Sequence, residues 1–307
     1  MESVKVYAPA SVANVGCGYD TMGFAIDSVG EELILSKRTD SLLMIKETVG
    51  AALSSDPEQN VATIAIKALL NALNSDQGFD VSIIKHFKPG SGLGSSASSA
   101  AGAVFAANEL LGTPFSKTEL LPFALEGEAF ASGCYHADNV APSLLGGFQV
   151  IRGYDPLDFF EVKVSSDLKV LIVFPDVQVK TIESKGLLPK EVSILTARNQ
   201  WANTAALVQA LNTNDMALLK RAIEDHIAEP VRKSFIPLYS DVKSIAEKSG
   251  SVGFNISGSG PSMFSFFSDD SGPKKMACEV KSLYENAGFH FKIYTSKIDT
   301  KGCKVIV

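Results

Sequence analysis

The sequence is poor in cysteine, in clustered basic charge and in long apolar runs. Four cysteines are scattered over 307 residues with no close pair, which predicts reduced thiols in the cytoplasm and neither a disulfide framework nor a structural zinc site. The net charge is −6 at pH 7 and no Lys/Arg cluster occurs, so no nucleic-acid partner is expected. Segment 89–108, as long as any uncharged segment of the chain, consists mainly of Gly, Ser and Ala, and the start of the chain lacks a signal-peptide pattern. Neither predicts a membrane segment.

The length and the order of the elements predict two domains of mixed α and β structure. A chain of 307 residues is long for one hydrophobic core. A turn-prone stretch at 154–158 suggests a boundary, with domains at 1–158 and 159–307. We expect a strand over 4–8 followed by a loop from Pro9, and helices over 190–211 and 215–228. The second half alternates strands and helices in a pattern compatible with a ferredoxin-like layer.

Glycine and serine are concentrated between residues 88 and 97, after a strand-like run and before a long helix of small residues. Gly90, Gly92 and Gly94 allow unusual dihedral angles and a close approach to a ligand. Ser95 and Ser96 stand where the helix begins, where their hydroxyls could cap it or reach a metal-bound phosphate. The first amides of a helix have no internal acceptors and the helix dipole favours negative charge there. This stretch therefore predicts a phosphate cradle.

Other interpretations of this stretch are possible from the residues alone. A Gly/Ser run after a strand is often only a flexible turn. The dinucleotide fingerprint needs an acidic residue about 20 positions further on, at the end of a strand. Glu109 and Glu119 lie instead within or at the start of predicted helices. The P-loop pattern requires a lysine after its second glycine, and none follows here.

Three motifs resemble those of the GHMP small-molecule kinases, in the family's order and across most of the chain. They are Pro-x-x-x-Leu-Gly-Ser-Ser-Ala at 89–97, Pro-x-Ser-x-Ala-Asn-x-Gly-x-Gly-x-Asp at 9–20, and Ser-Gly-Ser-Gly-Pro-Ser at 257–262. The resemblance implies an α+β fold, with an N-terminal domain like domain 2 of ribosomal protein S5 and a ferredoxin-like C-terminal domain. It also implies ATP binding. The implied nucleotide-binding residues are Asn60, Pro89, Gly90, Ser91, Gly92, Leu93, Gly94, Ser95 and Ser96, although capping of a helix explains Asn60 equally well.

The first motif most resembles that of the homoserine kinases within this family, whereas galactokinases carry a Gly-Arg-x-Asn pattern here. Asn14 and Asp20 could form an Asx turn and a helix cap. The resemblance favours a role in gripping the substrate, and it implies that Asn14 also takes part in catalysis. Gly258, in the third motif, is implied to bind the same substrate.

Glu126 and Glu128 lead into a second polar segment, 133–142. With the cradle upstream, Glu128 is expected to bind Mg²⁺ together with Ser96, since this hard cation prefers carboxylate and hydroxyl oxygens. His-x-Asp-Asn-x-Ala-Pro at 136–142 matches the homoserine kinase pattern. It implies substrate-binding roles for His136 and Asp138 and a catalytic role for Asn139, although His136 could equally be structural. Mevalonate and galactose kinases usually carry an aspartate at the place of Asn139, and an amide cannot act as that base.

A cationic clamp for the substrate carboxylate is implied by Glu-Pro-Val-Arg at 229–232. Arg232 would supply it, although a basic residue after a helix is commonly solvated. Relatives carry a second arginine four residues after a threonine. Here Thr181 is present but Lys185 takes the arginine's place. Lysine keeps the charge without the bidentate fork.

The resemblance thus implies an ATP- and Mg²⁺-dependent kinase of L-homoserine, with a homodimer as a family expectation. Another GHMP kinase, acting on mevalonate or a sugar, would use the same cradle. A non-catalytic nucleotide sensor on this scaffold is an alternative of a different class.

Overall fold

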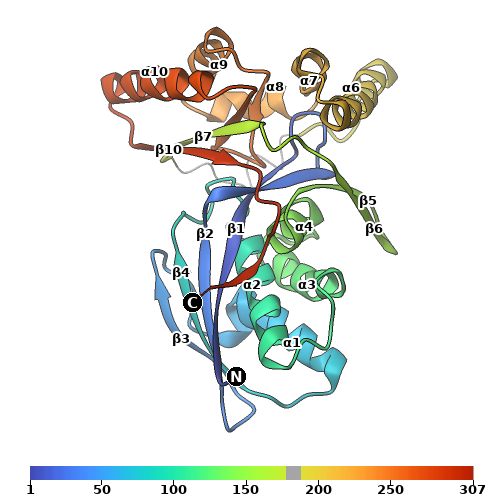
Figure 1. Ribbon diagram of the computed structural model, residues 1–307, viewed down its shortest axis with the longest axis vertical. Helices are drawn as coiled ribbons and strands as arrows, with labels where there is room; N and C mark the ends of the chain where they lie inside the picture. Colours follow the sequence, from blue (N-terminus) through green and yellow to red (C-terminus); the bar gives the residue numbers. More distant parts are fainter. Residues whose placement is uncertain (178–187, 307) are drawn as a thin grey trace.

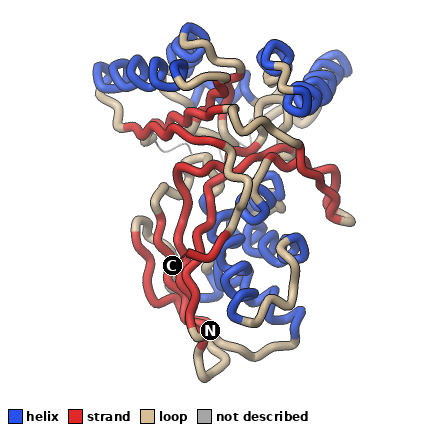
Figure 2. The backbone as a smooth tube through the Cα atoms, in the orientation of Figure 1, coloured by secondary structure: helices blue, strands red, loops and turns tan. Residues whose placement is uncertain are grey.

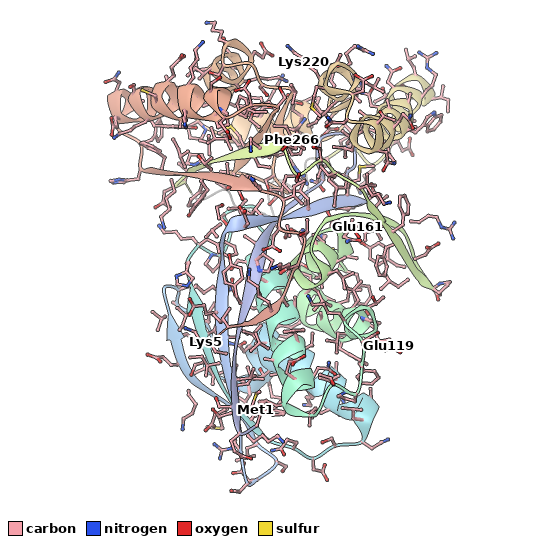
Figure 3. The ribbon with its side chains drawn as sticks, in the orientation of Figure 1. Met1, Lys5, Glu119, Glu161, Lys220 and Phe266 are labelled. Carbon is pink, nitrogen blue, oxygen red and sulfur yellow. The ribbon has the colours of Figure 1, made fainter. Side chains whose placement is uncertain are left out.

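The computed structural model describes residues 1–177 and 188–306. Its two parts follow one another along the long axis (Figure 1). The lower part holds the N-terminal strands with their helices, and the upper part holds the helices of the second half. Figure 3 places Met1 near the lower end and Lys220 near the upper end.

The lower part is built on a mixed sheet, of which seven strands lie in the described ranges. The strand order is β11-β1-β2-β4-β3, with β5 paired to β2 and β6 paired to β5. The strands are β1 (Ser3–Ala13), β2 (Met22–Lys37), β3 (Leu43–Val49), β4 (Phe79–Lys85), β5 (Phe148–Tyr154), β6 (Leu157–Val162) and β11 (Lys304–Ile306).

The loop expected from Pro9 onward begins later than predicted. β1 continues to Ala13, and its pairing with β2 shifts register between Pro9 and Ser11. A bulge accommodates a proline that cannot donate to the ladder. The strand thereby extends the first motif into the centre of the molecule.

Helices cover one face of this sheet (Figure 2). They are α1 (Val61–Leu73), α2 (Ser95–Leu110), α3 (Leu121–Ser132) and α4 (Ala137–Leu145). Asn60 caps α1, as the sequence predicted, by accepting from Ala62 N at 3.0 Å. Ser116 and Glu119 form the predicted capping box, in which Ser116 N donates to Glu119 Oε2 at 2.8 Å. That helix begins as a 3₁₀ turn, and Pro122 lies in the first turn of α3.

The predicted boundary at 158/159 falls within a hairpin of this sheet. β5 and β6 are antiparallel partners that meet at a tight turn after Tyr154. The turn signal was real, but a turn inside a hairpin and a linker between domains share the same residue types. The last strand, β11, also returns to β1, so both halves of the chain contribute to the first sheet.

The upper part contains an antiparallel sheet in the order β10-β7-β9-β8. Its strands are β7 (Lys169–Pro175), β8 (Gly253–Ile256), β9 (Met263–Phe267) and β10 (Phe291–Lys297). In chain order this is the arrangement 4-1-3-2. It confirms the ferredoxin-like layer and, with the first sheet, the α+β fold class.

The helices of the upper part are α6 (Ile194–Thr213), α7 (Met216–Ala222), α8 (Glu229–Arg232), α9 (Tyr239–Lys248) and α10 (Ser271–Ala287). The helix expected over 215–228 is shorter than predicted, because α7 ends at Ala222. Pro230 lies in the first turn of α8 rather than ending a helix, a position where proline loses no hydrogen bond. Arg232 therefore belongs to a short helix and not to a loop.

A continuous core joins the two parts. Phe24 of β2 lies against Phe264 and Phe266 of β9, with ring centroids 5.8 and 5.3 Å apart. All three side chains are fully buried, and Phe266 is labelled in Figure 3. Aromatic pairs at these distances add to the stability that burial provides. We therefore expect a rigid junction, on which the site described next is built. Among the described residues, no helix has both the length and the apolar character needed to cross a bilayer.

Candidate active site

The predicted cradle joins β4 to α2, and each of its three glycines has positive φ. The values are +77° at Gly90, +82° at Gly92 and +66° at Gly94. A Cβ on Gly92 would lie 2.6 Å from Ser257 O, and one on Gly94 would lie 2.2 Å from Ser11 Oγ. No neighbouring atom lies within 4 Å of a Cβ on Gly90. Two glycines are thus required by packing, and the third leaves space beside the cavity.

The cradle is held by hydrogen bonds to the third motif. Ser262 N donates to Ser91 O at 3.1 Å. Ser257 Oγ donates to Gly92 O at 2.6 Å. Because the carbonyls of the loop are occupied in this way, its shape is set before a ligand binds.

The start of α2 differs in detail from the prediction. Gly94 is the N-cap and forms no side-chain capping bond, so neither Ser95 nor Ser96 caps the helix. The amide of Ser98 bonds to Gly94 O at 2.9 Å. The amides before it lack intrahelical acceptors. They stand at the positive end of a 16-residue helix, which favours an anion.

A buried ion pair that the sequence analysis missed lies behind this helix start. Lys85 Nζ contacts Glu31 Oε1, and the two side chains are 2% and 0% exposed. Lys85 Nζ also donates to Ser95 Oγ at 2.7 Å and to Ser99 Oγ at 2.8 Å. Ser99 Oγ donates to Glu31 Oε2 at 2.7 Å. Each charge is therefore paired and hydrogen-bonded, as burial requires. Ser95 serves this network with its side chain.

Glu128 of α3 projects into the cavity with one free oxygen. The residue is 4% exposed, and its Oε2 has no hydrogen-bond partner among the described residues. Its Oε1 lies 3.4 Å from His136 Nδ1, which also lies 3.0 Å from Ser132 Oγ. A buried carboxylate oxygen without a protein partner is costly unless a ligand completes it.

Asp138 is a second buried carboxylate with an open oxygen. It is 1% exposed, and its Oδ1 has no partner in the described part of the chain. Burial, followed by the charges of Asp20 and Glu128, raises the pKa of Asp138 to about 7, while His136 opposes the rise. Desolvation dominates because an ionised carboxylate loses its hydration there.

The two asparagines predicted to act in catalysis both form hydrogen bonds to neighbouring loops and strands. Asn14 Nδ2 donates to Gly258 O at 3.0 Å, and Asn14 Oδ1 accepts from Asp20 N at 3.1 Å. Asn139 Oδ1 accepts from Ser11 Oγ at 3.1 Å. An amide NH₂ group has two donors, so each asparagine retains a hydrogen for a ligand.

Arg232 supplies a buried cation that lines the same cavity. It is 4% exposed, and its Nη1 donates to Gly258 O at 2.8 Å. Its guanidinium carbon lies 5.2 Å from the ring centroid of Tyr19. Its Nε has no hydrogen-bond partner among the residues described.

These groups surround one cavity of about 350 Å³. Most of the predicted site residues line it: Asn14, Asp20, Pro89, Gly90, Gly92, Gly94, Ser95, Ser96, Glu128, His136, Asp138, Asn139, Arg232 and Gly258. Tyr19, Ala131, Ser132 and Ser259 line it too and were not singled out from the sequence. Tyr19 adjoins the predicted Asp20, which was the available signal.

Other predicted residues lie elsewhere. The amide of Asn60 is engaged in capping α1 and in a bond to Ser54 O at 2.9 Å, and the residue does not line the cavity. Leu93 packs in the central core, and Ser91 is buried beside the cavity lining. Thr181 and Lys185 lie outside the described residues.

Comparisons with known proteins agree with this fold. The family description "GHMP kinases N terminal domain" matches residues 60–147, and "GHMP kinases C terminal" matches 207–286. The chain belongs to the GHMP kinase family.

Within that family, its similar relatives include homoserine kinases. The homoserine kinase of Chloroherpeton thalassium is 43% identical over 87% of each chain. That of Chlorobaculum tepidum is 38% identical over 100% of this chain and 99% of its own. The crystal structure of homoserine kinase from Cytophaga hutchinsonii has a TM-score of 0.97 and 41% identity, covering 100% of this chain and 98% of the other.

Proposed function

We propose that this protein transfers the γ-phosphoryl group of ATP to the side-chain hydroxyl of L-homoserine, giving O-phospho-L-homoserine and ADP. The reaction would serve threonine biosynthesis in the cytoplasm. One observation carries the proposal: the anion-binding start of α2 opens into the same cavity as a buried cation, Arg232, and two carboxylates, Asp20 and Asp138. The similarity to homoserine kinases over the full chain supports the same conclusion.

The nucleotide would bind with its phosphates against the first amides of α2. Gly90, Gly92 and Gly94 keep the backbone accessible there, and the helix dipole favours the negative charge. These donors are fixed before the reaction, so they can stabilise charge that develops in the transition state.

The residues at the cradle also fit Mg²⁺. Glu128 offers a buried, unpartnered oxygen, and Ser96 lines the same cavity. Mg²⁺ commonly binds one or two protein oxygens and completes its shell with phosphate and water. When bound, it would neutralise phosphate charge. The described residues contain no group of three or more His, Cys, Asp or Glu side chains suited to a metal.

The other side of the cavity suits a zwitterionic amino acid. Arg232 can pair with its carboxylate, since a guanidinium binds carboxylates by two parallel hydrogen bonds. Asp20 and Asp138 can accept from its ammonium or hydroxyl group. Gly258 O is already bonded to both Asn14 and Arg232, so it joins the two walls of this pocket.

Catalysis would depend mainly on positioning. Phosphoryl transfer passes through a loose transition state, in which alignment and charge neutralisation account for most of the rate. Asn14 and Asn139 would orient the hydroxyl and the γ-phosphate with their remaining donors. An amide at Asn139 cannot take the hydroxyl proton, and this speaks against a mevalonate-type mechanism based on an aspartate at that position.

A substrate panel tests the proposal. Purified protein with ATP and Mg²⁺ is offered homoserine, serine, threonine, mevalonate and galactose, and ADP release is followed by a coupled assay. We expect turnover with homoserine that exceeds the other alcohols by at least about 100-fold, since unpaired buried polar groups penalise analogues. ADP release with mevalonate or galactose instead would move the protein to another branch of the family. Nucleotide binding with no turnover would make it a sensor. Light scattering of the same preparation checks the expected homodimer.

A further inference from the structure

We propose that Tyr19 is a specificity-determining residue that fixes Arg232 for the carboxylate of the substrate. The inference rests on the proposed function and deepens it. Tyr19 lines the cavity beside Arg232, and its ring lies under the guanidinium, 5.2 Å from centroid to Cζ.

The remaining contacts of Arg232 show why the ring matters. In the described part of the chain, no carboxylate lies within 4.0 Å of its nitrogens, and Nη1 donates a hydrogen bond to Gly258 O. Its buried Nε is left open. The edge formed by Nε and the second terminal nitrogen is therefore available for the two parallel bonds that a carboxylate accepts. One neutral hydrogen bond does not fix the plane of a guanidinium, but an aromatic face packed against it does.

Tyr19 is itself held firmly by the loop on both sides. Cys17 O accepts from Gln200 Nε2 at 3.0 Å and from Thr204 Oγ1 at 3.2 Å. Asp20 N donates to Asn14 Oδ1 at 3.1 Å. Burial and the neighbouring carboxylate of Asp20 raise the pKa of Tyr19, against the effect of Arg232, so its hydroxyl stays protonated at neutral pH. The backbone that carries the Tyr19 ring is thus held on both sides of the residue.

The position of Tyr19 next to Asp20 gives the loop a double role. The ring of Tyr19 contacts the cation that would bind the substrate carboxylate, and the following residue supplies an anion for the ammonium group. Two consecutive residues therefore set the spacing between the groups that would bind the carboxylate and the ammonium of the substrate. An alcohol that lacks the carboxylate should lose this contribution.

Two alcohols that differ only in the carboxylate test the inference. L-homoserine is compared with 3-amino-1-propanol in the wild-type protein, in Tyr19→Leu, which removes the aromatic face, and in Tyr19→Phe, which keeps it. For each we measure KM and kcat/KM, or the inhibition constant against homoserine where turnover is too slow. Phe160→Leu removes an exposed ring outside the cavity and serves as the control.

In Tyr19→Leu we expect KM for homoserine to rise about tenfold, as the loss of a desolvated cation–π contact allows, with kcat within about twofold. The values for 3-amino-1-propanol should stay within about twofold of wild type. Tyr19→Phe should raise KM for homoserine less than about threefold, which also guards against a folding defect in the leucine variant. If kcat/KM in Tyr19→Leu falls equally for both alcohols, or if KM for homoserine is unchanged, the role of Tyr19 is overturned while the proposed function stands. Failure of the wild-type protein to phosphorylate homoserine would overturn the proposed function and the inference with it.

Discussion

The two sides of the cavity are built in different ways. The nucleotide side consists of backbone: positive-φ glycines, helix amides and carbonyls already bonded to the third motif. The side proposed for the metal and the alcohol consists of buried charges with open atoms, namely Glu128 Oε2 at the metal position and Asp138 Oδ1 and Arg232 Nε in the alcohol pocket. The first side is stable without its ligand. The second is completed only when the ligand arrives, because a buried polar atom without a partner raises the free energy of the folded state.

This difference predicts opposite responses to mutation. Isosteric changes of charge should damage the alcohol side and the metal position while leaving the fold intact or improving it. Addition of a single methyl group should damage the nucleotide side and the fold together. The predictions below test this contrast.

The largest effect is expected from Glu128→Gln. The substitution keeps the shape of the side chain and removes the charge that would hold Mg²⁺, so kcat should fall about 1,000-fold. Excess homoserine should not restore it, because the metal and phosphate are misaligned rather than the alcohol.

Glu126→Gln is the matched control for this variant, on the same helix. Glu126 accepts a hydrogen bond from Tyr135 Oη at 2.9 Å on the exposed surface, so kcat should stay within about twofold. Steady-state rates over a Mg²⁺ titration provide the measurement. A rate loss in Glu128→Gln that saturating homoserine rescues would move Glu128 into the alcohol pocket.

The second prediction compares two glycines of the cradle. Gly94→Ala adds a Cβ 2.2 Å from Ser11 Oγ and 2.7 Å from Asn139 Oδ1, whereas Gly90→Ala meets no atom within 4 Å. Both carry the strain of positive φ, about 1 kcal/mol. Overpacking should cost Gly94→Ala a further ~1–3 kcal/mol in the free energy of unfolding.

Urea denaturation of both variants, with KM for ATP, measures this contrast. Gly94→Ala should lose stability and nucleotide binding together, while Gly90→Ala should lose about 1 kcal/mol of stability or less. Equal stability losses would mean that packing does not dictate the glycine at position 94.

Much of this architecture could be predicted because its signals are local. A cradle, a capping box and a ferredoxin-like order of elements each leave a pattern within a short stretch. The family motifs then brought Asn14, Glu128, Asp138 and Arg232 to one cavity. The same locality explains the errors: the turn after Tyr154 has the composition of a linker but closes a hairpin.

The features that escaped prediction depend on partners far apart in the chain. Lys85 and Glu31 are 54 residues apart, and each alone resembles an ordinary strand charge. Tyr19 and Arg232 meet only because α8 returns to the first motif. Asn60 carried two possible roles, and the structure accounts for its amide by capping. Pairings of this kind are set by tertiary structure, so no single stretch of sequence contains them.

The third prediction uses the pH dependence of stability. The raised pKa of Asp138, about 7, means that between about pH 4 and pH 7 the folded state binds a proton more tightly than the unfolded state. Stability contributed by the protonated form is therefore lost as pH rises through this window. Asp138→Asn removes the titration and should raise the free energy of unfolding at pH 8 by roughly 2 kcal/mol, with about 4 kcal/mol as an upper bound.

The gain of Asp138→Asn should shrink toward zero near pH 4, while homoserine phosphorylation falls. Chemical denaturation at pH 4.5, 6 and 8 gives the comparison. The exposed carboxylate of Asp76 provides the control, since Asp76→Asn should change stability by less than about 0.5 kcal/mol at each pH. If Asp138→Asn is less stable than the wild-type protein at pH 8, the ionised Asp138 carboxylate does not destabilise the folded state, and the prediction is wrong.

The smallest effect concerns a carboxylate that positions Arg232 from a distance. Asp225 is buried just before α8 and accepts from its first amide: Asp225 Oδ2 accepts from Glu229 N at 2.8 Å, and Asp225 Oδ1 accepts from Gln200 Nε2 at 3.0 Å. Asp215 caps α7 on the surface by accepting from Leu218 N at 2.9 Å. Either change to alanine removes a side-chain acceptor from amides at the start of a helix and should cost about 1 kcal/mol of stability, with more for the buried Asp225 because Gln200 also loses a partner. Only Asp225→Ala should also raise KM for homoserine, by about three- to tenfold, since α8 carries Arg232 to the cavity while α7 carries no residue that lines it.

Steady-state kinetics of the two variants separate an effect on helix stability from an effect on the position of Arg232. If KM for homoserine rises equally in both variants, the orientation of Arg232 depends on the overall stability of the protein and not on the hydrogen bonds of Asp225. The alcohol pocket would then tolerate small shifts of its side chains, although several of its buried polar atoms have no partner within the described residues.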